Sequence, residues 1–170
     1  SEFVITVNCG IIADKAKCLN LIELKKLETD IINNKPITPI NLTGMKILIA
    51  EDSEGMRIFI ENILRVTGGA EVDFAENGRI AVEKAASREY DLILMDIMMP
   101  VMSGDEATRK LKKMGTKAPI VALSARSLKS EIDKALEAGC DEYITKPVDI
   151  NKLLAMARKY KKKNQPEKYM

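Results

Sequence analysis

No histidine occurs among the 170 residues of this sequence, and that absence excludes several kinds of active site. Hydrolases that rely on a histidine base cannot operate within these residues, and neither imidazole metal ligands nor phosphohistidine can be present. The three cysteines, Cys9, Cys18 and Cys140, are odd in number and widely spaced, which argues against a disulfide framework and a cysteine metal site. A reduced, intracellular protein is therefore the simplest interpretation.

The sequence also lacks a membrane segment and a strong charge of either sign. No apolar run approaches the roughly 20 residues needed to span a bilayer, and no signal-peptide pattern is present. The 27 basic and 25 acidic residues leave a net charge of +2, and the basic run at 158–163 is typical of a solvated helix end. We therefore expect a cytoplasmic location, with any membrane anchor elsewhere in the parent protein, and no contact of these residues with nucleic acid or membrane.

Apolar runs that alternate with amphipathic segments predict the fold class. Strands are expected at 46–50, 72–74, 92–95, 120–123 and 143–145, and helices around 56–64, 80–85, 104–114, 127–138 and 150–157. We expect Met114 and Leu136 to be among the helical side chains that face inward. The alternation predicts right-handed βαβ units and hence an α/β fold, a doubly wound, five-stranded parallel sheet with helices on both faces.

Polar side chains stand where four of the predicted strands end. They are Glu51 and Asp52 after the first strand, Asp96 at the end of the third, Ser124 after the fourth and Lys146 after the fifth. Open α/β sheets bind ligands at the carboxyl edge of their strands. Three carboxylates, a hydroxyl and an amine are therefore expected in one place, which favours an aspartate that accepts a phosphoryl group.

The expected carboxylates repel one another and require a compensating cation. Mg²⁺ is the natural candidate, because it accepts one or two carboxylates and completes its octahedron with water and phosphate oxygens. Asp96 can then attack phosphorus, as carboxylate nucleophiles do in aspartyl-phosphate enzymes. Lys146 supplies a point charge and Ser124 a hydroxyl for the phosphoryl oxygens, because phosphoryl transfer depends mainly on alignment and charge neutralisation.

Residues 45–163 resemble the receiver domains of response regulators in two-component signalling. The resemblance rests on Glu51-Asp52, on the loop at 95–104 that reads Met-Asp-Ile-Met-Met-Pro-Val-Met-Ser-Gly, on Ser124-Ala125 and on Lys146-Pro147. It implies a flavodoxin-like fold and a phosphorylation site at Asp96. The phosphoryl donor would be a phosphohistidine of a histidine kinase or histidine phosphotransfer domain, which must lie outside this chain.

The same resemblance implies a role for each site residue. Mg²⁺ would be ligated by Asp52, Asp96 and the backbone carbonyl of Met98, with Glu51 acting through a water molecule. The Lys146-Pro147 peptide should be cis. Ser124 and Tyr143 would form the conformational switch that responds to phosphorylation. The sequence departs from the common family pattern in two places, with glutamate first in the acidic pair and serine in place of threonine.

The flanking segments suggest the origin of the chain. Residues 1–8 are either a remnant of a preceding kinase ATP-binding domain, whose closing strand they resemble, or a cloning remnant. Residues 9–44 are expected to be a linker, with a helix over 13–33 that is either solvated or part of a dimer contact. Residues 164–170 are a polar tail. Because 41–44 resemble the lead-in to receivers fused behind a kinase, we expect the receiver of a hybrid histidine kinase.

Two other functions remain open at this level. An aspartate-nucleophile phosphatase of the haloacid dehalogenase type needs a second acid two residues after its nucleophile, and Met98 occupies that position. A degenerate receiver that serves only for docking or homodimerisation usually loses part of the acidic cluster or the lysine, whereas this sequence retains both. The expected function is therefore a phosphoacceptor that phosphorylates itself from a donor, and not a stand-alone turnover enzyme.

Overall fold

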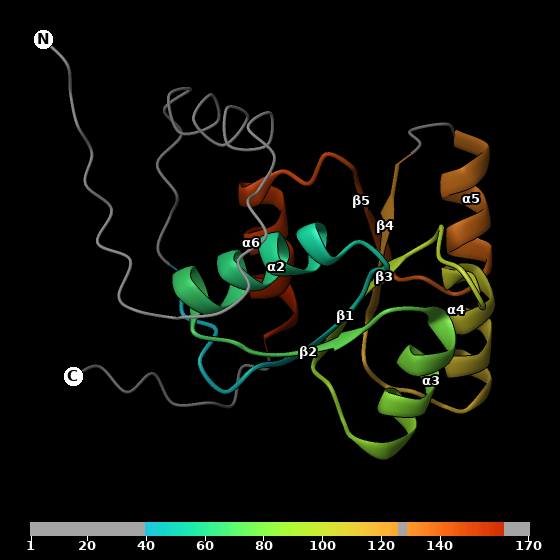
Figure 1. The fold of residues 1–170 in the computed structure, drawn as a ribbon, viewed down its shortest axis with the longest axis horizontal. Helices are drawn as coiled ribbons and strands as arrows, with labels where there is room; N and C mark the ends of the chain where they lie inside the picture. Colours follow the sequence, from blue (N-terminus) through green and yellow to red (C-terminus); the bar gives the residue numbers. More distant parts are fainter. Residues whose placement is uncertain (1–39, 126–128, 162–170) are drawn as a thin grey trace, which may run out of the picture. The chain divides into compact units, whose positions relative to one another are not determined.

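The computed structural model describes residues 40–125 and 129–161. Its centre is a five-stranded, wholly parallel sheet with the strand order β2-β1-β3-β4-β5 (Figure 1). The strands are β1 (Lys46–Ala50), β2 (Glu71–Ala75), β3 (Leu92–Asp96), β4 (Ile120–Ser124) and β5 (Glu142–Thr145). The helices are α2 (Glu54–Asn62), which continues as the π-helix η1 (Ile63–Thr67), α3 (Gly78–Ser87), α4 (Gly104–Lys113), α5 (Lys129–Glu137) and α6 (Ile150–Tyr160). The predicted doubly wound α/β fold is confirmed.

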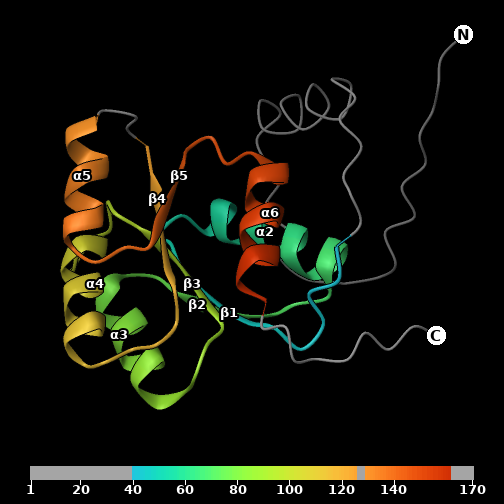
Figure 2. The same cartoon turned by 180° about the vertical axis from the view of Figure 1, so that it is seen from behind.

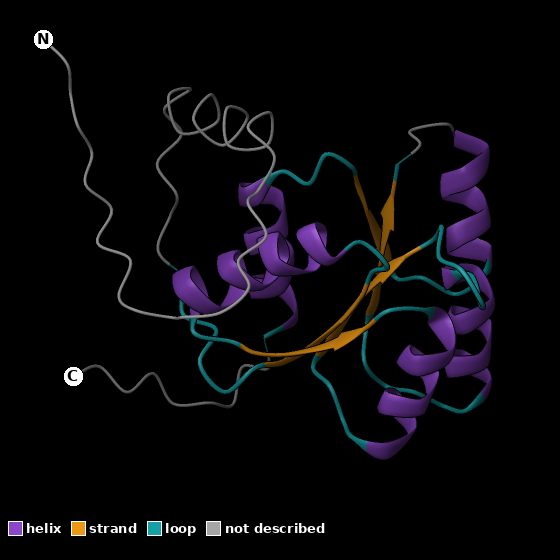
Figure 3. Cartoon of the chain, viewed as in Figure 1, coloured by secondary structure: helices purple, strands orange, loops and turns teal. Residues whose placement is uncertain are grey.

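Helices cover both faces of the sheet. Two opposite views show α2 and α6 on one face and α3, α4 and α5 on the other (Figure 1, Figure 2), and the strands form the layer between them (Figure 3). Side chains that alternate along each strand divide the core accordingly. On β1, Ile47 and Ile49 pack in the cluster that includes α2 and α6, whereas Leu48 and Ala50 pack in the cluster that includes α3, α4 and α5.

The central strands are buried on both faces, as their apolar sequences predict. Every residue of β3 and of β4 is buried, including the polar residues Asp96 and Ser124 that end them. Burial of one leucine or isoleucine side chain contributes about 2 kcal/mol, so the apolar runs hold these strands in place. The polar ends are therefore carried on the most firmly packed part of the sheet.

Two aspartates accept hydrogen bonds from backbone amides at the amino-terminal edge of the sheet. The carboxylate of Asp91 accepts a hydrogen bond from the first amide of β1, at Lys46, over 2.9 Å. The carboxylate of Asp141 accepts one from the first amide of β4, at Ile120, over 2.8 Å. Each aspartate precedes one strand and satisfies a backbone donor of its neighbour, which sets the register of the strands that carry the site.

Side-chain caps lie at the starts of the two helices that follow β1 and β3. Ser53 accepts a hydrogen bond from the amide of Met56 at the start of α2, and Ser103 accepts one from the amide of Glu106 at the start of α4. Such a cap stabilises a helix by about 1 kcal/mol. Both serines end loops that leave the carboxyl edge of the sheet, so the caps also limit the length of these loops.

The packed unit begins before the boundary expected at Met45. Leu42 has no exposed surface and lies in the core beside η1 and α6, and its amide donates to the carbonyl of Gly68 over 2.5 Å. A Cβ atom on Gly68 would meet the Leu42 side chain at 2.6 Å, so this contact requires glycine. At the other end of the domain, Lys161 donates to the carbonyl of Asn41 over 2.9 Å. Leu42, in the segment predicted to be a linker up to residue 44, is therefore part of the core.

Two side chains predicted to face inward are exposed instead. Met114 is 55% exposed because α4 ends at Lys113, and Gly115 then turns the chain away with a φ of 79°. Leu136 is 43% exposed, and its neighbour Ala135 takes the inward position on α5. The predictions for residues 1–8, the helix at 13–33 and the tail at 164–170 lie outside the described residues.

Candidate functional site

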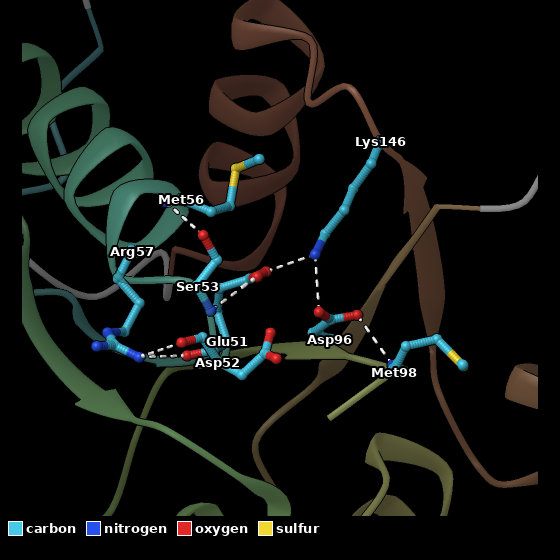
Figure 4. Close-up of polar contacts among 8 residues, drawn as sticks. All are labelled: Glu51, Asp52, Ser53, Met56, Arg57, Asp96, Met98 and Lys146. Atoms are coloured by element: carbon cyan, nitrogen blue, oxygen red, sulfur yellow. Dashed lines mark hydrogen bonds and ion pairs between the residues drawn. The ribbon is translucent and has the colours of Figure 1, made fainter. Parts of the chain in front are cut away.

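Four strands bring the predicted site residues to one edge of the sheet. In the register of the strands, Ala50 pairs with Met95, Asp96 pairs with Leu123, and Ser124 pairs with Thr145. The residues that follow or end these strands are consequently neighbours. Figure 4 shows Glu51, Asp52, Asp96 and Lys146 directed toward one another from β1, β3 and β5. This is the carboxyl edge, where open α/β sheets bind ligands.

Lys146 bridges two buried carboxylates. Its ammonium nitrogen Nζ donates to Oε2 of Glu51 over 2.6 Å and to Oδ2 of Asp96 over 2.8 Å. The side chains of Glu51 and Asp96 are 2% and 5% exposed, and that of Lys146 is 17% exposed. Burial of two carboxylates close together is unfavourable unless a cation lies between them. The lysine after β5 provides that cation, and its peptide bond to Pro147 is cis, the isomer that the family resemblance implies.

Burial and the contacts within the site shift the pKa values of Glu51 and Lys146. Burial raises the pKa of Glu51 above its ordinary value, and the nearby charge of Asp96 adds to the rise, against the hydrogen bond from Lys146. Burial lowers the pKa of Lys146, but the hydrogen bonds and charges of Asp96 and Glu51 outweigh it, so that the pKa lies above its ordinary value. Lys146 is therefore a persistent cation in the site.

The acidic cluster has the donor set that a hard divalent cation takes. Carboxylate oxygens of Glu51, Asp52 and Asp96 lie within 4.8 Å of one another. Asp52 is exposed, and within the described part of the chain its carboxylate has no hydrogen bond or ion pair. Lys146 engages one oxygen each of Glu51 and Asp96 and forms no ion pair with Asp52. An exposed carboxylate beside two buried ones fits Mg²⁺, which binds through one or two carboxylates and keeps several waters.

The loop after Asp96 folds back onto the strand that precedes it. The amide of Met98 donates to Oδ1 of Asp96 over 3.0 Å, and the amide of Gly104 donates to the carbonyl of Ile97 over 3.0 Å. A Cβ atom on Gly104 would lie 2.0 Å from the carbonyl oxygen of Asp96, so only glycine permits this approach. Val101, at the exposed end of the loop, has a φ of 67°, a conformation that is strained for a β-branched residue. The loop thus places the amide of Met98 against the Asp96 carboxylate. The strained conformation of Val101 is part of the same loop.

Ser124 and Tyr143 lie on neighbouring strands and on the same face of the sheet. Ser124 pairs with Thr145, two residues beyond Tyr143, and alternate residues of a strand share a face. Ser124 is buried, and its carbonyl accepts a hydrogen bond from the amide of Lys146 over 2.7 Å. Tyr143 is partly buried against the core cluster beneath α3, α4 and α5, with the Lys152 ammonium 5.2 Å from its ring centre.

One residue at the site was missed in the sequence. The guanidinium of Arg57, on α2, donates from Nη1 to the carbonyls of Glu51 and Asp52 over 2.8 and 3.1 Å (Figure 4). An arginine in the first turns of a helix is ordinarily a surface residue, so residue type gave no reason to select it. The available signal was its position four residues after the Ser53 cap, because helical side chains lean toward the helix N-terminus.

Among the described residues, no helix is both long and apolar enough to cross a bilayer. This holds for each of the helices that pack on the sheet.

Comparison with known sequences finds response regulators and a hybrid histidine kinase among the relatives of this chain. The profile described as "Response regulator receiver domain" matches residues 47–158. The two-component response regulator ORR41 of rice is 41% identical over 120 residues, which are 69% of this chain and 94% of the relative. Hybrid signal transduction histidine kinase G of Dictyostelium discoideum is 43% identical over 120 residues, 68% of this chain, but these span only 4% of that protein.

Solved structures are similar over the same part of the chain. The receiver domain of the sensor histidine kinase PA1611 from Pseudomonas aeruginosa, with a magnesium ion coordinated in its active-site cleft, has a TM-score of 0.65 and 33% identity, over 69% of this chain and 98% of that one. The receiver domain of the yeast response regulator Ssk1, crystallised with the histidine phosphotransfer protein Ypd1, has a TM-score of 0.64 and 31% identity, over 69% and 88%. Both neighbours are therefore similar in fold and, at a lower level, in sequence.

Proposed function

The chain belongs to the family of response regulator receiver domains, and on that premise we propose that Asp96 is the residue that accepts the phosphoryl group. The observation that carries the proposal is the contact of Lys146 with both Glu51 and Asp96 at the carboxyl edge of the sheet. It sets a buried nucleophilic carboxylate beside a cation and beside the exposed Asp52. A phosphoryl group needs this combination of nucleophile and positive charge.

In the proposed reaction, a carboxylate oxygen of Asp96 forms a bond to phosphorus while the bond from phosphorus to the donor imidazole nitrogen breaks. The imidazole leaves and takes up a proton. Asp96 itself supplies the electron pair, so no general base is needed. The amide of Met98, which donates to Oδ1 over 3.0 Å, orients the carboxylate and keeps Oδ1 in a hydrogen bond. The sequence contains no histidine, so the donor belongs to another domain or protein.

Mg²⁺ would be held by Asp52 and Asp96, with Glu51 acting through water and the Met98 carbonyl as a further ligand. When bound, it would neutralise charge on the phosphoryl oxygens. Support within this chain comes from the three carboxylates within 4.8 Å of one another. The Glu51 carboxylate is mostly buried and is engaged by Lys146, which agrees with an indirect role, whereas the exposed Asp52 is accessible to a direct one.

Lys146 and the Ser124–Tyr143 pair are proposed to read the phosphorylated state. The Lys146 ammonium would exchange its contact with Asp96 for one with a phosphoryl oxygen, because the phosphoryl group carries more negative charge than the carboxylate. Ser124, whose carbonyl already accepts from the Lys146 amide, would bond the phosphoryl group with its hydroxyl. Tyr143 would follow on the same face of the sheet. Such a change is a local charge event that biases a two-state element.

The partner is proposed to be a histidine kinase or histidine phosphotransfer domain, and the parent protein a hybrid histidine kinase. Support for the partner is the similarity to the Ssk1 receiver crystallised with Ypd1, and support for the parent is the similarity to the Dictyostelium hybrid kinase. The receiver domain itself would span residues 45–163, preceded by a linker whose Leu42 packs against the core of the domain. Sequencing of the reading frame around it identifies the parent protein, and a DNA-binding module directly downstream would contradict the hybrid-kinase origin.

The test of the phosphoacceptor is the intact mass of the protein after incubation with acetyl phosphate. Wild type, Asp96→Asn and the control Asp133→Asn, which changes an exposed aspartate on α5, are each incubated with and without MgCl₂. One added phosphoryl group is expected in wild type and in the control, and only with Mg²⁺. Circular dichroism of Asp96→Asn should match wild type, since the substitution is nearly isosteric. Phosphorylation of Asp96→Asn would contradict the assignment.

The remaining outcomes distinguish the two alternative functions. Absence of any added phosphoryl group, also after incubation with a phosphorylated histidine phosphotransfer protein, would favour a docking or dimerisation module. Repeated turnover of a phosphate monoester would favour a phosphatase. The haloacid dehalogenase mechanism is opposed by Met98, which cannot protonate a leaving group from the second position after the nucleophile.

A further inference from the structure

We infer that Arg57 is a positioning residue for the acidic cluster, and that it acts by holding the backbone of the loop between β1 and α2. The inference rests on the proposed function, since it concerns the metal site of the receiver. Arg57 does not contact the Asp96 carboxylate. Its guanidinium nitrogen Nη1 donates to two consecutive carbonyls, those of Glu51 and Asp52, over 2.8 and 3.1 Å.

The two carbonyls belong to the residues whose side chains form two thirds of the acidic cluster. Glu51 and Asp52 follow β1 directly, and α2 begins only two residues later at Glu54. One nitrogen with two hydrogens can bond both carbonyls only if they are turned toward the same side. The contact therefore restricts the orientation of two successive peptide groups, and with it the directions in which both carboxylates leave the backbone (Figure 4).

The peptide group between Asp52 and Ser53 transmits this restraint to Glu51. In a trans peptide the carbonyl and the amide point in opposite directions. While Arg57 holds the carbonyl of Asp52, the amide of Ser53 points away from Arg57 and donates to Oε1 of Glu51 over 3.4 Å. Oε2 of the same carboxylate accepts from Lys146 over 2.6 Å. Arg57 thus supports the Glu51 carboxylate through the backbone, from the side opposite Lys146.

The local structure of α2 places Arg57 for this role. Ser53 caps the helix, and the amide of Arg57 donates to the carbonyl of Ser53 over 3.0 Å. A helical side chain leans toward the N-terminus of its helix, so a long side chain at this position reaches back over the first turn to the loop. The planar guanidinium offers several donors in a rigid arrangement. A serine cap and an arginine four residues later together define the path of the loop.

The direction in which the affinity for Mg²⁺ changes on removal of Arg57 distinguishes a positioning role from an effect of its charge. Arg57 is a cation near a proposed cation site, so its charge alone opposes the binding of Mg²⁺. If Arg57 acted only through its charge, its removal would strengthen the binding of Mg²⁺. If it acts by orienting the loop, its removal weakens binding, because the carboxylates lose the arrangement that the ion requires. The two roles therefore predict opposite changes in the dissociation constant.

The experiment measures the affinity for Mg²⁺ alone, by isothermal titration calorimetry with MgCl₂, in wild type, Arg57→Met and Arg57→Lys. The matched control is Arg65→Met, because Arg65 lies on the continuation of the same helix and, among the residues that the structure describes, its side chain pairs only with Glu61. We expect the dissociation constant to rise roughly tenfold in Arg57→Met, as for other residues that orient metal ligands. Arg57→Lys, which keeps a donor and the charge, should recover part of this loss. Arg65→Met should bind at least as tightly as wild type.

Salt and stability controls complete the test. Titrations are made well below the unfolding temperature of each variant, so that a lower stability does not enter the dissociation constant. The weaker binding of Arg57→Met should persist at about 1 M salt, where charges act over only about 3 Å. Equal or tighter binding by Arg57→Met, or a difference that disappears in salt, would overturn the inference while leaving the proposed function intact. Failure of wild type itself to bind Mg²⁺ would contradict the proposed function.

Discussion

Lys146 donates a hydrogen bond from Nζ to Oδ2 of Asp96 over 2.8 Å, although 50 residues separate the two in the sequence. The same nitrogen bonds Glu51 over 2.6 Å. The lysine therefore offsets the repulsion between two buried carboxylates that come from different strands. A substitution of Lys146 should therefore change both the chemistry of the site and the stability of the fold.

Replacement of Lys146 by methionine should destabilise the protein in the absence of Mg²⁺. Removal of one partner from a buried ion pair costs about 3 kcal/mol, and Lys146 serves two carboxylates. Addition of MgCl₂ should restore part of the loss, because a bound cation stabilises the folded state by mass action. Urea denaturation with and without MgCl₂ measures both effects. Lys113→Met, at an exposed position on α4, is the control, and an equal loss of stability in both variants would contradict the prediction.

Gly104→Ala should disrupt the loop that carries the phosphoacceptor. The added Cβ would lie 2.0 Å from the carbonyl oxygen of Asp96, and the backbone must move to relieve the overlap. We expect a loss of about 3 kcal/mol and slower phosphorylation from acetyl phosphate. Gly55→Ala is the matched control, because a Cβ there meets nothing within 4 Å and alanine favours the helix by about 0.5 kcal/mol or more. Unfolding curves in which both variants behave alike would show that the close approach at Gly104 is unimportant.

Val101→Asn should stabilise the protein. Val101 has a φ of 67° and is 75% exposed. Its left-handed conformation therefore costs free energy that burial of the side chain does not offset. Asparagine tolerates that conformation, and the relief should amount to about 1 kcal/mol in the free energy of unfolding. Val66→Asn, at an exposed valine in η1, serves as the control for lost apolar surface. A lower stability of Val101→Asn than of the control would mean that the Val101 side chain has a packing role.

The acid stability of the domain should depend in part on Glu142. Hydrogen bonds from Lys159 and Tyr160, which join β5 to α6, hold the pKa of Glu142 below its ordinary value. A carboxyl group whose folded pKa is lowered stabilises the protein above its unfolded pKa, and this contribution is lost as the pH falls through the folded pKa. Glu142→Gln should therefore reduce stability at neutral pH and flatten the decline below about pH 4.5. Thermal unfolding from pH 7 to pH 3 tests this, with Glu137→Gln on α5 as the control, and an unchanged slope would contradict it.

The order and type of the elements were predictable, because they depend on local patterns. Short apolar runs specify buried strands at any position in a parallel sheet, and helical periodicity specifies the segments between them. The polar residues after these runs were predictable for the same reason. Since parallel strands end at one edge, Glu51, Asp52, Asp96, Ser124 and Lys146 could be assigned to a common site without knowledge of any distance.

Boundaries and supporting contacts depended on interactions between distant residues. Leu42 resembled a linker residue and is buried because Gly68, remote in sequence, leaves space for it. Met114 matched the apolar periodicity of α4 but is exposed, because the helix ends one residue earlier. The residue type of Arg57 gave no reason to select it, since its partners are backbone carbonyls, which every residue has, and only its spacing from the Ser53 cap could have indicated the contact. Local sequence encodes which groups are available, whereas the tertiary fold decides which of them meet, because those contacts form only when strands and helices pack together.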